Sequence, residues 1–284
     1  MAIFSNRATL TYNGISTDSN VVTGEIVGVL SATKAAAGDS YTQDGCVTYA
    51  VSIVNSGTLP YTNLTVTDNL GAYPFGTGTL VPLDYVDGSV LLFVNGEEVT
   101  APTVTAGPPL VFSGISVPAG GNAVLIYRAK ANGFAPPAVG GAITNTATVS
   151  GAGLITPITA SETVNAAEGA SLGITKALSP VTVSENGEIT YTFVISNYGN
   201  APVLATDNAT VTDTFDPRLE NITVTYNGAA WTEGTEYTYD EASGVFATAP
   251  GQITLPAATY AQDPVTGAWS VIPAEVTLTV TGTV

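Results

Sequence analysis

The sequence contains no histidine and a single cysteine, Cys46, and it has only six lysine and arginine residues. Without histidine, neither a Ser–His–Asp triad nor the usual Cys/His zinc site can be built. A lone cysteine cannot close a disulfide within the chain. No apolar run reaches ~18 residues, so no membrane-spanning helix is predicted. The first ten residues lack the charged stretch and apolar run of a secretion signal, so we expect either a signal that has been removed or a non-classical route of export.

Negative charge dominates the few ionisable residues. The chain has 23 aspartates and glutamates against six lysines and arginines, a net charge of −17. Phosphate backbones and anionic lipid surfaces would be repelled, so we expect no nucleic-acid partner and no membrane insertion. No loop carries the dense alternating carboxylates of a calcium site, and we predict no metal and no cofactor.

Thr, Val, Ala, Gly and Tyr are abundant, and apolar residues alternate along short segments. Val47, Tyr49, Val51 and Ile53, for example, fall on one face of an extended segment. Apolar residues at helical spacing are absent, while Gly, Pro and Asn-Gly turns are frequent. This pattern predicts an all-β chain with two immunoglobulin-like β-sandwich domains in tandem.

An internal repeat defines the two domains. Residues 31–60 match residues 173–202, and NLTVTDNL (63–70) matches NATVTDTF (208–215). The first repeat continues into residues 143–164, which are predicted to form a closing hairpin, whereas the second reaches Val284 where such a hairpin should begin. We therefore expect a complete sandwich over 28–168 and an incomplete acceptor sandwich over 169–284.

The segment that the second repeat lacks occurs at the other end of the chain. Residues 4–22 match the closing hairpin, and the equivalent pairs are Phe4/Ile143, Asn6/Asn145, Ala8/Ala147 and Leu10/Val149. An open sheet edge can be closed by a donated strand, which adds main-chain hydrogen bonds and side-chain contacts. The sequence thus predicts a donor hairpin over 1–27, with Phe4, Ala8 and Leu10 on the donor strand.

Spacing along the chain favours donation to another subunit. Asn145 precedes Lys176 by 31 residues and Asn6 precedes Lys34 by 28, so the hairpin should sit in a domain just before the first sandwich. The few residues after it cannot span a sandwich ~30–40 Å long at ~3.5 Å each. An unclosed head-to-tail contact builds a filament, so the expected partners are copies of the chain itself. A piece of a longer array of repeats, and closure within one chain, remain the alternatives.

The repeats resemble the bacterial surface repeat family called domain of unknown function 11. The residues that carry the resemblance are ITKALSPVTVSENGEITYTFVISNYGNAP (174–202), VTD at 66–68 and 211–213, and NTATVSG (145–151). The resemblance implies immunoglobulin-like sandwiches in extracellular bacterial or archaeal proteins, without enzymatic activity. The chain departs from it by carrying the closing motif, residues 6–10, at its start.

Strand alternation also points three polar residues of each repeat inward. These are Lys34, Asp68 and Asn145 in the first repeat and Lys176, Asp213 and Asn6 in the second. An unpaired buried charge is costly, so each lysine should meet its aspartate. The simplest interpretation is a buried ion pair with the asparagine as a hydrogen-bond partner.

The same three residue types can also form an isopeptide bond spontaneously. Burial favours a neutral amine, which attacks the asparagine amide, and a protonated carboxyl, which assists. The arrangement is similar to that of Gram-positive pilin and adhesin domains, with lysine on the first strand and asparagine on the last. It predicts a cross-link from Lys34 to Asn145 within the subunit, and from Lys176 to Asn6 of the next, with Asp68 and Asp213 as assisting carboxyls.

These features predict a structural subunit of an extracellular fibre or appendage, on a cell or spore surface, that assembles head to tail. The alternative is a passive stalk or adhesin module. An enzyme acting on polysaccharide would need paired carboxylates in a cleft, and no pair is indicated by spacing.

Overall fold

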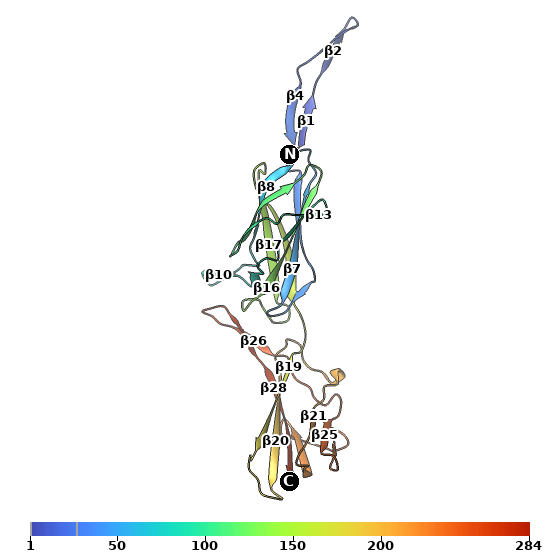
Figure 1. The fold of residues 1–284 in the computed structure, drawn as a ribbon, viewed down its shortest axis with the longest axis vertical. Helices are drawn as coiled ribbons and strands as arrows, with labels where there is room; N and C mark the ends of the chain where they lie inside the picture. The colour runs from blue at the N-terminus through green and yellow to red at the C-terminus, as the bar shows by residue number, and fades with distance from the viewer. Residues whose placement is uncertain (1, 27) are drawn as a thin grey trace. The chain divides into compact units, whose positions relative to one another are not determined.

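The computed structural model describes residues 2–26 and 28–284. They form strands and one short 3₁₀ helix, with no α-helix in the described part, which confirms the predicted all-β fold. Within these same residues, no helix is long and apolar enough to cross a membrane. The chain divides into two compact units (Figure 1). Unit 1 comprises Met1–Pro136, Gly140–Ala166 and Pro264–Ala268; unit 2 comprises Pro137–Val139, Ala167–Asp263 and Trp269–Val284.

The N-terminal segment is a long β-hairpin. Its strands are β1 (Ala2–Asn6), β2 (Thr9–Tyr12), β3 (Ile15–Asp18) and β4 (Val22–Ile26). β1 pairs with β4 and β2 pairs with β3, both antiparallel. Asn13 and Gly14 turn the chain with positive φ angles of 48° and 79°, which suits an Asn-Gly hairpin turn. None of the described hairpin residues belongs to the core of unit 1.

The body of unit 1 is a two-sheet sandwich. Its strands are β5 (Leu30–Ala36), β6 (Ser40–Tyr41), β7 (Cys46–Asn55), β8 (Tyr61–Asp68), β9 (Tyr73–Phe75), β10 (Gly78–Leu80), β11 (Leu83–Tyr85), β12 (Leu91–Val94), β13 (Glu97–Val99), β14 (Thr103–Thr105), β15 (Leu110–Val117), β16 (Asn122–Ala131), β17 (Ala142–Ser150) and β18 (Ile158–Ala166). One sheet has the order β13-β12-β16-β7-β5, with β11 also on β16, and the other has the order β14-β15-β8-β17-β18-β6. β9 and β10 form a separate hairpin.

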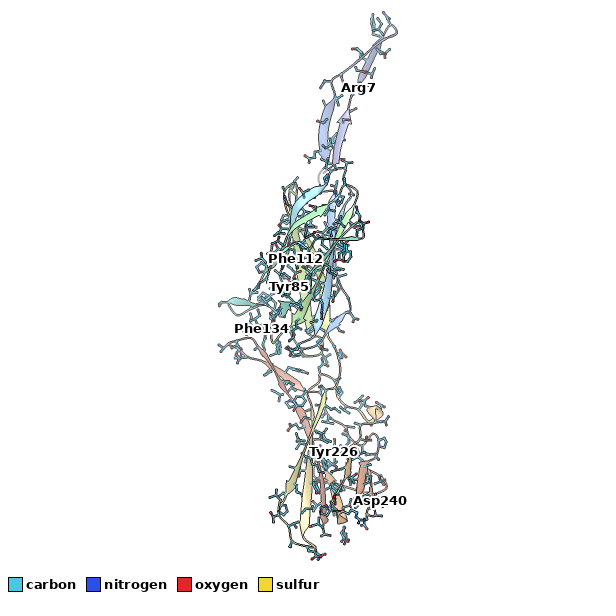
Figure 2. All side chains as sticks on the ribbon, viewed as in Figure 1. Arg7, Tyr85, Phe112, Phe134, Tyr226 and Asp240 are labelled. Atoms are coloured by element: carbon cyan, nitrogen blue, oxygen red, sulfur yellow. The ribbon has the colours of Figure 1, made fainter. Side chains whose placement is uncertain are left out.

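Alternating residues of both sheets fill the core of unit 1. Tyr49, Phe112 and Tyr127 are fully buried, and the rings of Phe112 and Tyr127 lie 5.1 Å apart between centroids. Tyr85 meets Phe112 edge to face, at 6.1 Å (Figure 2). Such tilted and edge-on contacts are favourable for aromatic rings. The core therefore places aromatic side chains beside the inward-pointing polar residues.

Unit 2 has one full sheet and one small sheet. Its strands are β19 (Leu172–Ser179), β20 (Glu188–Asn197), β21 (Thr212–Thr214), β22 (Glu220–Tyr226), β23 (Ala229–Trp231), β24 (Tyr237–Asp240), β25 (Val245–Thr248), β26 (Thr259–Gln262), β27 (Trp269–Ile272) and β28 (Ala274–Thr283), with a 3₁₀ helix at Ala205–Asp207. The full sheet has the order β19-β20-β28-β22-β23. The small sheet has the order β21-β25-β24, and β26 pairs with β27.

The small sheet of unit 2 differs from its counterpart in unit 1 at one edge. In unit 1, β8 lies between β15 and β17. In unit 2, β21 pairs only with β25 among the described residues. The sequence match predicts an extended strand over 208–215, yet only Thr212–Thr214 is a strand and Ala205–Asp207 is helical. A strand without its neighbour loses one row of main-chain hydrogen bonds, which accounts for the shorter element.

Candidate functional site

Lys34 and Asp68 form a buried ion pair in unit 1. Lys34 lies on β5 of one sheet and Asp68 ends β8 of the other, so the pair joins the two sheets. The ammonium of Lys34 donates to Oδ2 of Asp68, and both side chains are 0% exposed. The second oxygen of Asp68 accepts the backbone N–H of Leu70 at 2.9 Å. Because a buried carboxylate needs several donors, these contacts stabilise it in the core.

Tyr127 and Asn145 complete this cluster, which we call the Lys34 site. The Tyr127 hydroxyl donates to Oδ2 of Asp68, and Nδ2 of Asn145 donates to the Tyr127 oxygen at 3.3 Å. The Gly71 N–H donates to Oδ1 of Asn145 at 3.3 Å. A donor on the amide oxygen and an acceptor on the amide nitrogen together fix the orientation of the Asn145 side chain.

Burial changes the acidity of the Lys34 site. It lowers the pKa of Lys34 to about 8, and the charges of Asp68 and Glu162 oppose this shift. The amine of Lys34 is therefore neutral more often near neutral pH than the amine of an exposed lysine, although the protonated form still predominates below pH 8. Burial also raises the pKa of Tyr127, so its hydroxyl keeps its proton and remains a donor. Lys34 Nζ lies 4.7 Å from the ring centroid of Tyr49, which favours the charged form.

Sequence reasoning placed Lys34, Asp68 and Asn145 on inward faces, and the structure buries all three. It missed Tyr127 and the Gly71 N–H. The signal for Tyr127 was available, because strand β16 alternates and its inward residues are Ala123, Leu125, Tyr127 and Ala129. The roles of these residues in a cross-link remain predictions.

The equivalent pair in unit 2 is open to solvent. Lys176 on β19 contacts Asp213 on β21, with 39% and 19% of their side chains exposed. The Lys176 Nζ lies 4.4 Å from the ring centroid of Tyr191, as Lys34 lies over Tyr49. Tyr127 has no equivalent, because the residue opposite Tyr191 in the sheet is Val280. Unit 2 thus holds the lysine and aspartate without the asparagine and the phenol.

The face of β19 that carries Lys176 also carries exposed apolar side chains. Leu172 is 49% exposed, whereas its counterpart in unit 1, Leu30, is 6% exposed. Ile174 and Leu178 are 55% and 36% exposed. In unit 1 the corresponding strand β5 is in contact with β18. The exposed face of unit 2 is therefore the surface that a closing hairpin covers in unit 1.

The predicted donor residues lie on the N-terminal hairpin. Phe4, Asn6, Ala8 and Leu10 are all exposed, and Asn6 is opposite Val22 on β4. The Phe4 ring lies over Gly24, where any added side chain would overlap it. Arg7, which is labelled in Figure 2, lies on the opposite face. It forms an ion pair with Asp18 at 3.1 Å. The hairpin has one largely apolar face and one polar face.

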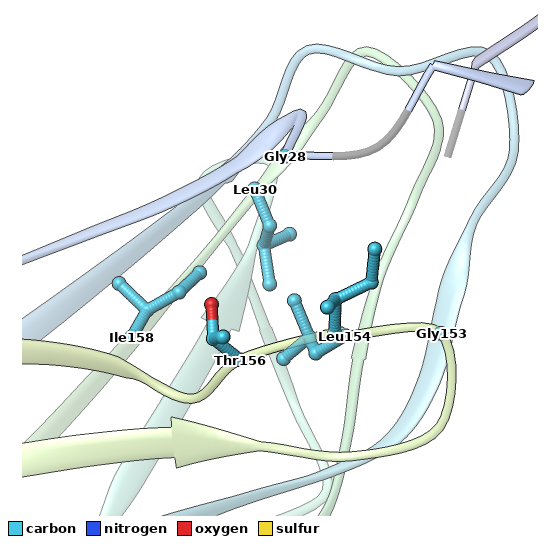
Figure 3. Close-up of a pocket in the computed structure, with 7 residues that line it drawn as sticks. Gly28, Leu30, Gly153, Leu154, Thr156 and Ile158 are labelled. Atoms are coloured by element: carbon cyan, nitrogen blue, oxygen red, sulfur yellow. The ribbon is translucent and has the colours of Figure 1, made fainter.

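A shallow pocket in unit 1 lies beside the start of β5 (Figure 3). Its volume is about 270 Å³. It is lined by Gly28, Leu30, Gly153, Leu154, Ile155, Thr156 and Ile158. None of these side chains titrates near neutral pH, so this pocket offers no acid–base pair.

No family model and no curated protein matches the chain, so the resemblance to domain of unknown function 11 stays a prediction. Solved structures with a similar course of the chain include BcpA, the major pilin subunit of Bacillus cereus, at 12% identity and a TM-score of 0.36 over 96% of this chain and 73% of that one. The collagen-binding domain of a Staphylococcus aureus adhesin matches at 9% identity and a TM-score of 0.32, over 47% of this chain and 96% of that domain. Red sea bream transglutaminase, an enzyme, matches at 13% identity and a TM-score of 0.27, over 87% and 31%. Likeness at this level carries no information on function.

Proposed function

We propose that the protein is a structural subunit of a surface fibre, in which the N-terminal hairpin of one copy closes unit 2 of another. The observation that carries the proposal is the contrast between the covered strand β5 and the exposed strand β19. Leu172 and Ile174 are about half exposed, and β21 has a free edge within the described residues. An apolar face beside an open edge is a typical acceptor for an added strand.

The hairpin has the properties of a donor. Eight of its large apolar residues are more than half exposed: Ile3, Phe4, Leu10, Tyr12, Ile15, Val21, Val22 and Ile26. A two-stranded hairpin without a covered face is at best marginally stable in water. Burial of these side chains against β19 and β21 of another copy would stabilise both partners. Each copy then has one donor and one acceptor, which generates an open filament.

We further propose that isopeptide bonds lock the fibre. In the Lys34 site, the neutral amine of Lys34 attacks Cγ of Asn145 and forms a C–N bond, while the bond from Cγ to Nδ2 breaks. One amine proton passes through Asp68 to the departing nitrogen, which leaves as ammonia. The contacts of Asp68 with Lys34, and of Tyr127 with Asn145, support this route. Asn6 would supply the equivalent amide to Lys176 and Asp213 of the acceptor.

Electron microscopy of the purified protein tests assembly. We expect filaments one subunit wide from the full chain and none from a chain that lacks residues 1–22. The shortened chain still has an acceptor, so when it is mixed with the full chain it should terminate growth and shorten the filaments. Monodisperse particles from the full chain, or filaments from the shortened one, would contradict the proposal.

Intact mass tests the covalent part separately. A subunit with the Lys34–Asn145 bond is lighter by one ammonia, and Asn145→Ala should abolish that loss. Filaments joined through Lys176 and Asn6 should survive boiling in detergent, and Asn6→Ala should make them dissociate. A wild-type subunit of unreduced mass would end the Lys34–Asn145 proposal and leave hairpin donation standing.

A further inference from the structure

We infer that the hairpin docks whole, in the register of β17 and β18, with Ala8 opposite Asp213 and Glu25 opposite Thr182 of the second copy. This inference rests on the proposed function and specifies its interface. It states which main-chain positions meet, and that both β1 and β4 enter the acceptor.

The two hairpins of the chain pair their strands in the same way. In the closing hairpin of unit 1, Ile143 is opposite Val164 and Asn145 is opposite Glu162. In the N-terminal hairpin, the equivalent positions are Phe4 opposite Gly24 and Asn6 opposite Val22. The correspondence holds for the four pairs from Ile3–Glu25 to Asn6–Val22. Beyond them the pairing is shifted by one residue, because Thr9 is opposite Asp18 whereas its equivalent Thr148 is opposite Thr159. Between β1 and β4 the hairpin therefore already has the register of the element that it would replace.

One cross-strand pair of side chains differs between the two hairpins, but the two side chains together keep a similar total volume. Ile143 and Val164 are both buried in unit 1. In the N-terminal hairpin this pair becomes Phe4 and Gly24, and the ring occupies the space above the glycine. A large residue with glycine fills about the same space as two medium ones, which is the exchange that packed cores tolerate best. It also ties β4 to β1, because Phe4 without Gly24 would not fit.

The positions on the acceptor follow from unit 1. There, Ala147 of β17 is opposite Asp68 of β8, and Thr148 is opposite Thr67. The repeat maps Asp68 and Thr67 onto Asp213 and Thr212. Ala8 and Thr9 are the equivalents of the two β17 residues, so Ala8 meets Asp213 and Thr9 meets Thr212.

The second strand is placed in the same way. β18 pairs in parallel with β6, with Asn165 opposite Ser40. The equivalent residues are Glu25 on β4 and Thr182 in unit 2. Thr182 lies in a segment without a strand partner among the described residues, and its neighbour Val181 is 86% exposed. Docking would convert this segment, and residues 208–211, into strands.

Engineered disulfides test the register. The parent chain carries Cys46→Ser and Asn6→Ala, so that the only links that survive denaturation are the engineered ones. We expect Thr9→Cys with Thr212→Cys to give a reducible ladder of covalent oligomers in most of the protein. Opposite residues have Cα atoms about 4.5–5.5 Å apart, within disulfide range. Thr11→Cys with Thr212→Cys is the matched control, shifted by about 6.8 Å along the strand, and should give several-fold less.

A third pair, Glu25→Cys with Thr182→Cys, tests whether β4 docks too, and should also give a ladder. A ladder only from the shifted control would overturn the register. A ladder from Thr9 and Thr212 but none from Glu25 and Thr182 would overturn docking of the whole hairpin. Filaments without any ladder would overturn the inference and leave the proposed function intact, whereas the absence of filaments from a Cys46→Ser chain would contradict the proposed function itself.

Discussion

The two units of the chain hold the same lysine–aspartate pair in opposite environments. In unit 1, Lys34 and Asp68 are fully buried, whereas Lys176 and Asp213 of unit 2 are 39% and 19% exposed. The sheet strands that carry the pairs are equivalent, and so is the aromatic ring beside each lysine. What differs is the closing hairpin, β17 and β18, which only unit 1 has among the described residues. The burial of the pair therefore differs with the presence of that hairpin, and we propose that the reactivity of the lysine follows its burial.

The largest expected difference between the two units comes from removing the aspartate of each pair. Asp68→Ala leaves the Lys34 amine buried without its partner and should lower the free energy of unfolding of unit 1 by about 3–5 kcal/mol. Asp213→Ala removes a partly buried partner from a lysine that solvent can reach, and should cost at most about 1 kcal/mol in the unassembled subunit. Denaturant unfolding measures both free-energy changes. The signal of unit 2 can be separated, because the only tryptophans, Trp231 and Trp269, lie in that unit. Tryptophan fluorescence therefore follows unit 2, and circular dichroism follows both units. Equal losses would show that the two pairs are equally buried in solution.

A second matched pair tests the apolar face beside each lysine. Leu30→Ala removes a buried side chain and should destabilise unit 1 by about 2–5 kcal/mol. Leu172→Ala, at a position 49% exposed, should change the unassembled subunit by no more than about 0.5 kcal/mol. In filaments the Leu172 substitution should be more destabilising than in the unassembled subunit. The denaturant midpoint for filament dissociation should therefore be lower than that of wild-type filaments. A large loss in the unassembled subunit would mean that β19 is already covered.

The sequence alone predicted which polar residues point inward and which segments are equivalent. The inward positions of Lys34, Asp68 and Asn145 follow from strand parity, because side chains of an extended chain alternate strictly between two faces. The equivalence of residues 4–10 with 143–149 follows from the repeat alone. Local periodicity was sufficient to predict on which face of a single strand a residue lies.

Features that depend on contacts between strands could not be predicted. The Tyr127 hydroxyl reaches Asp68 and Asn145 because two sheets pack face to face, and no local pattern fixes that distance. Likewise, residues 208–211 are predicted to be part of a strand but do not form one in unit 2. Strand formation depends on the neighbour that supplies hydrogen bonds, and the sequence of the strand does not carry that information.

The two sites also differ at Tyr127, because unit 2 has Val280 at the equivalent position. Tyr127→Phe removes one hydroxyl from Asp68 and Asn145, and should destabilise unit 1 by about 1–3 kcal/mol. It should also slow the loss of ammonia, followed by intact mass over time. Tyr73→Phe is the control, because that hydroxyl bonds the Phe134 carbonyl at 2.8 Å, away from the Lys34 site. If both variants lost ammonia at the wild-type rate, Tyr127 would have no part in orienting the amide.

The smallest expected effect is a dependence on pH that only an unlinked Lys34 can show. The pKa of a free Lys34 amine, about 8 in the folded protein, lies below its value of 10.5 in the unfolded state, and an Asn145→Ala chain keeps that amine free to titrate. Above pH 8 the unfolded state binds more protons, so stability should rise with pH, by at most about 1.4 kcal/mol per unit. Below pH 8 both states hold the proton and this contribution is flat.

The groups that face Lys34 limit the window in which the rise can be seen. Asp68 and Glu162 act on Lys34 by raising its pKa, and burial raises the pKa of Tyr49 and Tyr127 in the folded state. In the unfolded state tyrosine loses its proton near pH 10, which makes stability fall with pH. The rise due to Lys34 should therefore be measured only up to about pH 9.5. A chain with Lys34→Met and Asn145→Ala should show no rise. The wild-type chain should also be flat if its Lys34 is held in an amide, which has no proton to titrate in this range; a rise of the same size in the wild-type chain would mean that the amine is free.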